Sequence, residues 1–295
     1  MAVTTSFDGY DFVIRKLLAS SLALIAAASL AGCAPQGPES RMPAGLEVES
    51  MSVATGPVTG GTKITITGTG FENVDRVAFG SVDAESISVV DGALEVVAPP
   101  STNFTVGSVP IMISTADAAA APTGKQFEYA AGSPVSRQLA YLGAWWKTAN
   151  RQAFGKLDGT DCVNFTSQGL LARGFPMNGE WWHSQSNGVN QYGRPWISST
   201  ALRDYLLARP DAATELEPTD LSQLAVGDIA QFDWDNSGNR DHTATVSKIT
   251  GVGPDREVFV VGHSPGYIDM PVYDLLHDDD KKKTDPVVHY IHLID

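Results

Sequence analysis

Two residues in the second half of the chain, Cys162 and His242, are of types that can act together in nucleophilic chemistry. A histidine that takes the proton of a thiol turns it into a strong nucleophile. The sequence holds only two cysteines, and the other, Cys33, lies directly after an N-terminal apolar run. If Cys33 is modified there, Cys162 has no partner for a disulfide. It is then either a reactive thiol or a small buried hydrophobic residue.

The residues around Cys162 are typical of the start of a helix. A turn, Asp158-Gly159-Thr160, precedes it, and the apolar pattern that follows ends at Gly174. We expect Asp161 to be the N-cap and Cys162 to lie in the first turn. The unpaired N–H groups there and the positive end of the helix dipole favour a thiolate. The same groups can stabilise an oxyanion on a substrate carbonyl.

A general base for this thiol is predicted on a strand. His242 opens the run 242–249, and alternation places Ala244 and Val246 on the same, apolar face. We expect that face to point toward the helix of Cys162, although a purely structural histidine would fit the same pattern. The next predicted strand, Val258 to Gly262, is followed by His263. Adjacent antiparallel strands would bring His263 beside His242, where it could orient the imidazole.

These residues need a mixed α and β domain to position them. Ser133 and Pro134 predict a helix over 134–150, with a cap and a first-turn proline. The remaining elements expected in this half are a helix over 200–208 and strands over 228–232 and 286–293.

The segment 45–130 has a different character. Short runs of alternating apolar and polar residues, separated by turn residues, predict an antiparallel β-sandwich. The runs Gly56 to Thr62, Ile64 to Phe71 and Val77 to Gly80 resemble the IPT/TIG domain, an immunoglobulin-like fold. The segment contains no cysteine and no histidine. We therefore expect a spacer or a binding module with an unknown partner and no catalytic role.

The second half also resembles a known family. The motif residues are Trp145-Trp146, Asp161 to Gln168, Trp181-Trp182, Gly227-Asp228 and Asp241-His242-Thr243. Together they resemble an amidase domain of bacterial exported proteins and, more distantly, the NlpC/P60 and CHAP cell-wall peptidases. The resemblance covers residues 136 to 295 nearly end to end. It implies a papain-like α+β hydrolase domain over 134–295, with Cys162 and His242 as the catalytic pair. The third residue in NlpC/P60 enzymes is commonly a histidine on the strand after the base, a place that His263 matches, whereas other papain-like groups use Asn, Gln or Glu there.

The resemblance also indicates candidate substrate-binding residues. Asp161, Asn164 and Gln168 match the family motif, although helix capping and packing explain them equally well. Trp182 and His183 lie in a stretch rich in glycine, serine and asparagine that is either a wall of the substrate groove or an ordinary loop.

The N-terminus predicts export. Arg15 and Lys16 precede an apolar run from Leu17 to Leu30, as in a secretory signal peptide, and Leu30-Ala31-Gly32-Cys33 resembles a lipoprotein lipobox. We expect a signal peptide over 1–33, lipidation of Cys33, a flexible tether over 34–44, and a lipid-anchored location on the extracytoplasmic face of the cell membrane. The alternative, a membrane-spanning helix, would need a longer apolar run.

The charge of the chain and its acidic residues limit the classes of ligand that it is expected to bind. The formal net charge of −14 argues against nucleic acid, whose phosphates need a basic surface. The acidic loop from Asp233 to Asp241 resembles the start of a calcium-binding loop, but Ala244 stands where the closing glutamate would be. We therefore expect a hairpin turn there, and neither a metal nor a cofactor.

The predicted function is hydrolysis of amide bonds, most naturally in peptidoglycan peptides, through an acyl-thioester on Cys162. Two alternatives stay open on the sequence. One is a non-catalytic cell-surface binding lipoprotein with a degenerate hydrolase fold. The other is an acyltransferase or thioesterase of the same superfamily that uses the same residues.

Overall fold

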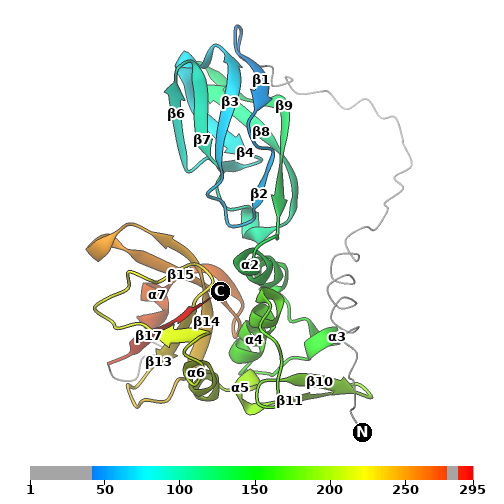
Figure 1. Ribbon diagram of the computed structural model, residues 1–295, viewed down its shortest axis with the longest axis vertical. Helices are drawn as coiled ribbons and strands as arrows, with labels where there is room; N and C mark the ends of the chain where they lie inside the picture. Colours follow the sequence, from blue (N-terminus) through cyan, green and yellow to red (C-terminus); the bar gives the residue numbers. More distant parts are fainter. Residues whose placement is uncertain (1–41, 278–284, 295) are drawn as a thin grey trace. The chain divides into compact units, whose positions relative to one another are not determined.

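The structure is a computed structural model that describes residues 42–277 and 285–294 (Figure 1). The predicted signal peptide, Cys33 and most of the tether lie outside the described residues. Within the described part of the chain, no helix combines the length and apolar character needed to cross a membrane.

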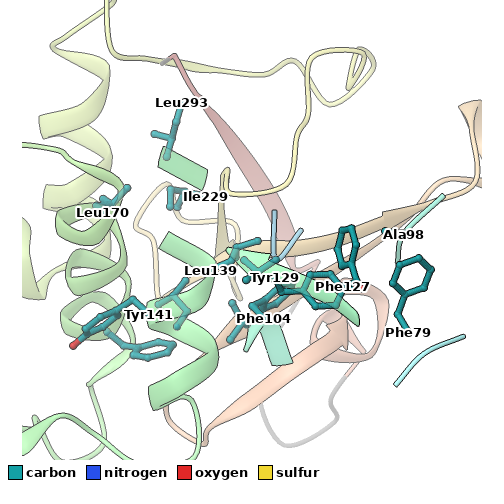
Figure 2. Close-up of a cluster of buried hydrophobic side chains, with 14 of the residues drawn as sticks. Phe79, Ala98, Phe104, Phe127, Tyr129, Leu139, Tyr141, Leu170, Ile229 and Leu293 are labelled. Atoms are coloured by element: carbon teal, nitrogen blue, oxygen red, sulfur yellow. The ribbon is translucent and has the colours of Figure 1, made fainter. Parts of the chain in front are cut away.

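The first domain has two sheets, as expected for the β-sandwich. One has the strand order β1-β3-β7-β6 and the other β2-β9-β8-β4-β5, and the neighbours are antiparallel except for the parallel pair β2 and β9. Phe127 packs edge-on against Phe79 and Tyr129 in its core (Figure 2). The strands are β1 (Glu47–Met51), β2 (Thr55–Pro57), β3 (Lys63–Thr69), β4 (Val74–Phe79), β5 (Val82–Asp83), β6 (Ser86–Val90), β7 (Ala93–Val97), β8 (Gly107–Thr115) and β9 (Ala118–Ala130).

The second domain is built on a fully antiparallel sheet with the strand order β12-β17-β13-β14-β15-β16. Its strands are β12 (Ala213–Glu215), β13 (Ile229–Asp233), β14 (His242–Thr250), β15 (Glu257–Gly262), β16 (Tyr267–Pro271) and β17 (Val287–Leu293), and a separate hairpin pairs β10 (His183–Ser186) with β11 (Val189–Tyr192). The helices are α2 (Pro134–Trp145), α3 (Arg151–Phe154), α4 (Cys162–Arg173), α5 (Arg194–Ile197), α6 (Ser199–Leu207) and α7 (Val272–Leu276).

Most predicted elements of this domain are confirmed to within one residue at either end. The exception is the first helix, which ends at Trp145 instead of continuing to Asn150. Asn150 has non-helical backbone angles and its side chain accepts a hydrogen bond from the N–H of Ala153, so it caps α3. A residue that caps a new helix cannot also continue the previous one.

The two faces of the sheet have separate cores. The helices α2 and α4 cover one face, where Leu139 and Leu170 belong to the same buried cluster as Ile229 and Leu293 (Figure 2). The other face carries a second cluster that includes Phe232, Ala244, Val246 and Tyr267, together with residues of α7. Cys162, at the start of α4, therefore approaches the sheet from the first face.

Candidate active site

A cavity of about 340 Å³ opens where the amino end of α4 meets the beginning of β14. It contains both residues predicted to form the catalytic pair. The lining residues are Gly159, Thr160, Cys162, Val163, Ile197, Ser199, Trp234, Arg240, Asp241, His242 and Ser264.

Cys162 begins α4, as predicted, and only 6% of its surface is exposed. Burial raises the pKa of the thiol. Hydrogen bonds from the backbone N–H groups of Thr243 and Val163 and from the side chain of Ser199 oppose that shift without cancelling it. The shift is opposite to the one expected from the helix end alone, because desolvation of the charged form outweighs the stabilising N–H groups.

Asp161 occupies the N-cap position but does not cap the helix through its side chain. Its Oδ1 accepts hydrogen bonds from the N–H of Leu157 and the side-chain amide of Asn164, and Oδ2 lies 2.8 Å from Nδ1 of His263. Burial by itself would raise the pKa of Asp161, but these hydrogen bonds outweigh it and lower the pKa below the ordinary value of 3.8. The carboxylate thus ties the start of α4 to the segment after β15, and it does not line the cavity.

His242 opens β14, as predicted, and is 8% exposed. The predicted orientation of its strand is wrong, because Ala244 and Val246 pack into the cluster on the face away from α4. His242 still lines the cavity with Cys162 because it is the first residue of the strand, at the edge that the amino end of α4 reaches. Its Nε2 lies 2.7 Å from the hydroxyl of Tyr267, and the rings of Phe232 and Trp234 lie beside the imidazole.

His263 does not orient His242, so the predicted hydrogen bond between the two histidines is wrong. Its Nδ1 bonds to Asp161, and its Nε2 lies 3.0 Å from the backbone carbonyl of Trp145. The ring also stacks on Phe165 with 3.8 Å between centroids. Both ring nitrogens are engaged by acceptors on α2 and at the start of α4, so His263 joins these helices to the sheet.

The two polar motif residues within α4 are buried structural groups. Asn164 donates to Asp161, and its Oδ1 accepts the indole N–H of Trp196. Gln168 accepts a hydrogen bond from the hydroxyl of Tyr141 at 2.6 Å. Neither lines the cavity, so the packing explanation fits their positions better than direct contact with a substrate there.

Trp182 and His183 also lie outside the cavity lining. The backbone carbonyl of Trp182 accepts the N–H of Gly193, and His183 begins the β10–β11 hairpin. The Nε2 of His183 lies 2.9 Å from Oδ1 of Asn190, and its ring packs against Phe154. This geometry favours the loop interpretation of the segment.

Several residues at the site were missed on the sequence. Tyr267 begins β16, Ser199 begins α6 and Trp234 directly follows β13, and each looks like an ordinary residue at the end of a strand or the start of a helix. Nothing in their local pattern marks them, because only the packing of α4 and α6 against the sheet brings them near Cys162. Arg240 was equally unmarked, yet its side chain is 6% exposed and pairs with Glu215 beside the cavity.

The acidic loop between β13 and β14 forms a hairpin, as predicted. Asp233, Asp235 and Asp241 each offer an oxygen within 4.8 Å of the others. Among the described residues, they form the cluster whose spacing could hold a metal ion. Both oxygens of Asp233 accept backbone N–H groups of the turn, from Ser237 and Gly238. The cluster is explained by turn formation.

Comparison with known proteins finds a matching domain family for each half of the chain. Residues 134–285, which are 152 of the 295 residues, match the family described as "Putative amidase domain". Residues 46–129 match the IPT/TIG domain. The matched ranges agree with the change in architecture between the sandwich and the mixed domain.

A curated relative is the "Uncharacterized protein YhbB" of Bacillus subtilis (strain 168), which is 26% identical over 156 residues. The alignment covers 51% of this chain and 47% of YhbB, so the chain spans about half the length of that relative.

Solved structures with partial similarity include the extracellular region of plexin A4. The two chains are 23% identical, and the match covers 29% of this chain and 8% of the plexin chain, with a TM-score of 0.25. The Bacteroides ovatus protein SGBP-B of a mixed-linkage glucan utilization locus is 12% identical, with coverage of 82% and 51% and a TM-score of 0.21. Scores this low carry no structural argument.

Proposed function

The chain belongs to the family described as "Putative amidase domain", and from this premise we propose that it is a cysteine hydrolase that cleaves amide bonds. Cys162 is the nucleophile and His242 the general base. The observation that carries the proposal is that the two side chains, 80 positions apart in sequence, line the same cavity at the amino end of α4. A nucleophile and a base at one concave site are the minimum machinery for acyl transfer.

In the first step, the Sγ of Cys162 attacks the carbonyl carbon of the amide and its proton passes to His242. Because Nε2 faces Tyr267, we assign Nδ1 to this transfer. The negative charge that develops on the carbonyl oxygen is stabilised by N–H groups in the first turn of α4, where no side-chain cap occupies them. The raised pKa of the thiol means that the proton leaves during the attack and not before it.

In the second step, the carbon–nitrogen bond breaks, and the imidazolium of His242 protonates the leaving amine. This leaves an acyl-thioester on Cys162. A water molecule then attacks the thioester carbonyl while His242 takes one of its protons. The carbon–sulfur bond breaks, the acid is released, and the proton returns to the thiolate, so the enzyme regains its starting state.

A papain-like relationship belongs to the same proposal. It is supported by a thiol at the start of a buried helix that packs on an antiparallel sheet, with the base at the beginning of one of the strands. The IPT/TIG domain contributes no residue to the cavity lining. We propose that it acts as a spacer or binding module.

For the substrate we propose peptide amide bonds of peptidoglycan, and for the location the extracytoplasmic face of the cell membrane. The support is the N-terminal pattern ending at Cys33 and the Pro/Gly/Ser-rich stretch after it. A protein held there by lipid, with a flexible tether, would reach the cell wall.

The test is digestion of purified peptidoglycan by the full-length protein and by its Cys162→Ala, His242→Ala and His277→Ala variants. His277 is an exposed histidine outside the cavity lining and serves as the matched control. We expect soluble fragments with a new free amine from the wild type and the His277 variant only. In parallel, iodoacetamide, a small thiol reagent, reports whether Cys162 is reactive.

Other outcomes would select an alternative. Labelling of Cys162 without release of fragments would favour a different substrate or an acyl acceptor other than water. Neither labelling nor release would indicate a surface binding protein with an inactive hydrolase fold. Release by the Cys162→Ala variant would contradict the cysteine mechanism outright.

A further inference from the structure

We infer that Tyr267 is the positioning residue of His242, in the role that the sequence pattern assigns to His263. The inference rests on the proposed Cys162–His242 pair and adds a third member to it. Tyr267 opens β16, and its hydroxyl lies 2.7 Å from Nε2 of His242. His263 cannot take this role because its two ring nitrogens bond to Asp161 and Trp145.

In the proposal, Nε2 of His242 donates this hydrogen bond and the phenolic oxygen of Tyr267 accepts it. During the attack by Cys162, the imidazole gains a proton on Nδ1 and keeps the one on Nε2. The contact therefore persists in both charge states, orienting the ring at rest and stabilising the imidazolium during reaction. Both partners are buried, with exposures of 8% for His242 and 5% for Tyr267, which strengthens the interaction.

Aromatic rings hold the imidazole in this orientation. The ring centroids of Phe232 and Trp234 lie 5.7 and 6.3 Å from that of His242, and the ring of Tyr267 lies at 6.1 Å. Rotation of the imidazole away from the hydroxyl would need these rings to move. Because all of them are buried or nearly so, the hydroxyl and the rings act as one support.

A second observation, independent of the hydrogen bond, concerns Gly262 at the end of β15. A Cβ atom added there would lie 2.5 Å from the hydroxyl oxygen of Tyr267 and 2.7 Å from its ring carbon Cζ. The backbone at this point therefore leaves the space that the phenol fills. Any side chain at position 262 would displace the hydroxyl from His242.

The chemistry of a phenol also suits the role. Burial raises the pKa of Tyr267, and the neighbouring Cys162 thiolate would raise it further, so the hydroxyl stays neutral while His242 changes charge. A neutral acceptor stabilises the imidazolium less than a carboxylate would. His242 can then return its proton to the leaving amine.

The test measures alkylation of Cys162 by iodoacetamide from pH 5.5 to 10.5 in the full-length protein. The extent of reaction is read by mass spectrometry on the tryptic peptide that ends at Arg173, so Cys33 does not interfere. The variants are Tyr267→Phe, Gly262→Ala, His242→Ala and the double variant of Tyr267→Phe with His242→Ala. Tyr290→Phe is the matched control, since Tyr290 is another buried tyrosine of the same core cluster but lies on β17, which is not a neighbour of β14 in the sheet. Arg240 and Asp241 also line the cavity and stay unchanged in every variant.

At pH 7 the thiol reacts with iodoacetamide as its proton passes to His242. We expect Tyr267→Phe to slow alkylation at that pH by about 10-fold, the effect of one hydrogen bond to a charged group. Gly262→Ala should slow it in the same direction. As the pH rises toward 10.5, hydroxide competes with His242 for the thiol proton, so the differences from the wild type should become smaller than at pH 7. The double variant should be no slower than His242→Ala alone, because the hydroxyl acts through the imidazole.

The contradicting outcomes are distinct. A Tyr267→Phe rate equal to that of Tyr290→Phe, with His242→Ala still slow, would overturn the role of Tyr267 and leave the catalytic pair intact. A loss that is the same at all pH values would show a merely structural effect and overturn the role as well. Wild-type alkylation at pH 7 that does not depend on His242 would overturn both the pair and the positioning role.

Discussion

Two histidines stand at the ends of neighbouring strands in this domain, and they have opposite surroundings. His242, at the start of β14, lines a cavity with a thiol and contacts a neutral phenol. His263, just after β15, lies between the carboxylate of Asp161, a backbone carbonyl and the ring of Phe165. Both are almost fully buried, so burial alone does not distinguish a reactive histidine from a structural one.

The difference lies in what each ring is able to do. Both ring nitrogens of His263 face oxygen atoms of the protein, the carboxylate of Asp161 and the carbonyl of Trp145, so a shift of its ring would break a contact between the helices and the sheet. His242 has the phenol of Tyr267 at Nε2, and its residue lines the cavity that also contains Cys162. If His242 is the base, as proposed, the comparison teaches that the base of this site differs from the structural histidine in having a partner that tolerates both of its charge states.

The largest expected effect separates the two histidines by activity. His242→Ala should lower the turnover rate by about 10²- to 10⁴-fold, the usual contribution of a general base. It should also lower the melting temperature, because the side chain is buried and bonds to Tyr267, so the rates are compared at a temperature where both proteins are folded. The measurement is initial rate on peptidoglycan together with thermal unfolding followed by circular dichroism. A variant that keeps more than half of the wild-type rate would show that His242 is not the base.

The second effect separates them by stability. His263→Ala should destabilise the fold by about 2–3 kcal/mol, because it removes the hydrogen bond to Oδ2 of the buried Asp161 carboxylate. Urea unfolding measures this loss. Combining His263→Ala with Asp161→Asn removes the buried charge, so the double variant should be more stable than His263→Ala alone. If the two variants unfold at the same urea concentration, the contact with the Asp161 carboxylate is not the source of the loss.

The third effect concerns the stability of the fold at acidic pH. The pKa of Asp161 is lowered in the folded protein, so its contribution to stability is present above the ordinary value of 3.8 and is lost as the pH falls through the lowered folded value. The wild type should therefore lose stability in this acidic range more steeply than Asp161→Asn does. Unfolding by urea at a series of pH values between 2 and 6 compares the slopes, and parallel curves would contradict the assignment.

The smallest effect concerns a third histidine, His183, on the β10–β11 hairpin. His183→Ala should cost about 1 kcal/mol from the lost hydrogen bond with Asn190. The turnover rate and KM should both stay within about twofold of the wild type. A clear rise in KM would show instead that the hairpin contacts the substrate, as the sequence pattern allowed.

The sequence by itself determined the elements that carry the chemistry. Proline, glycine and the alternation of apolar residues are local signals, so the helix that begins at Cys162 and ends before Gly174, and the strand that begins at His242, were predictable to within a residue. The IPT/TIG segment and the amidase domain were recognisable for the same reason, since their motifs lie in short continuous runs.

The tertiary structure alone decided which groups meet. Asp161 and His263 are 102 positions apart and His242 and Tyr267 are 25 apart, so no local pattern encodes either contact. The pKa of Cys162 is likewise set by burial under elements from several parts of the chain, which reverses the shift expected from the helix end alone. Hydrogen-bond geometry and desolvation depend on distances of a few tenths of an ångström and on exclusion of water, and both arise only when the helices pack on the sheet.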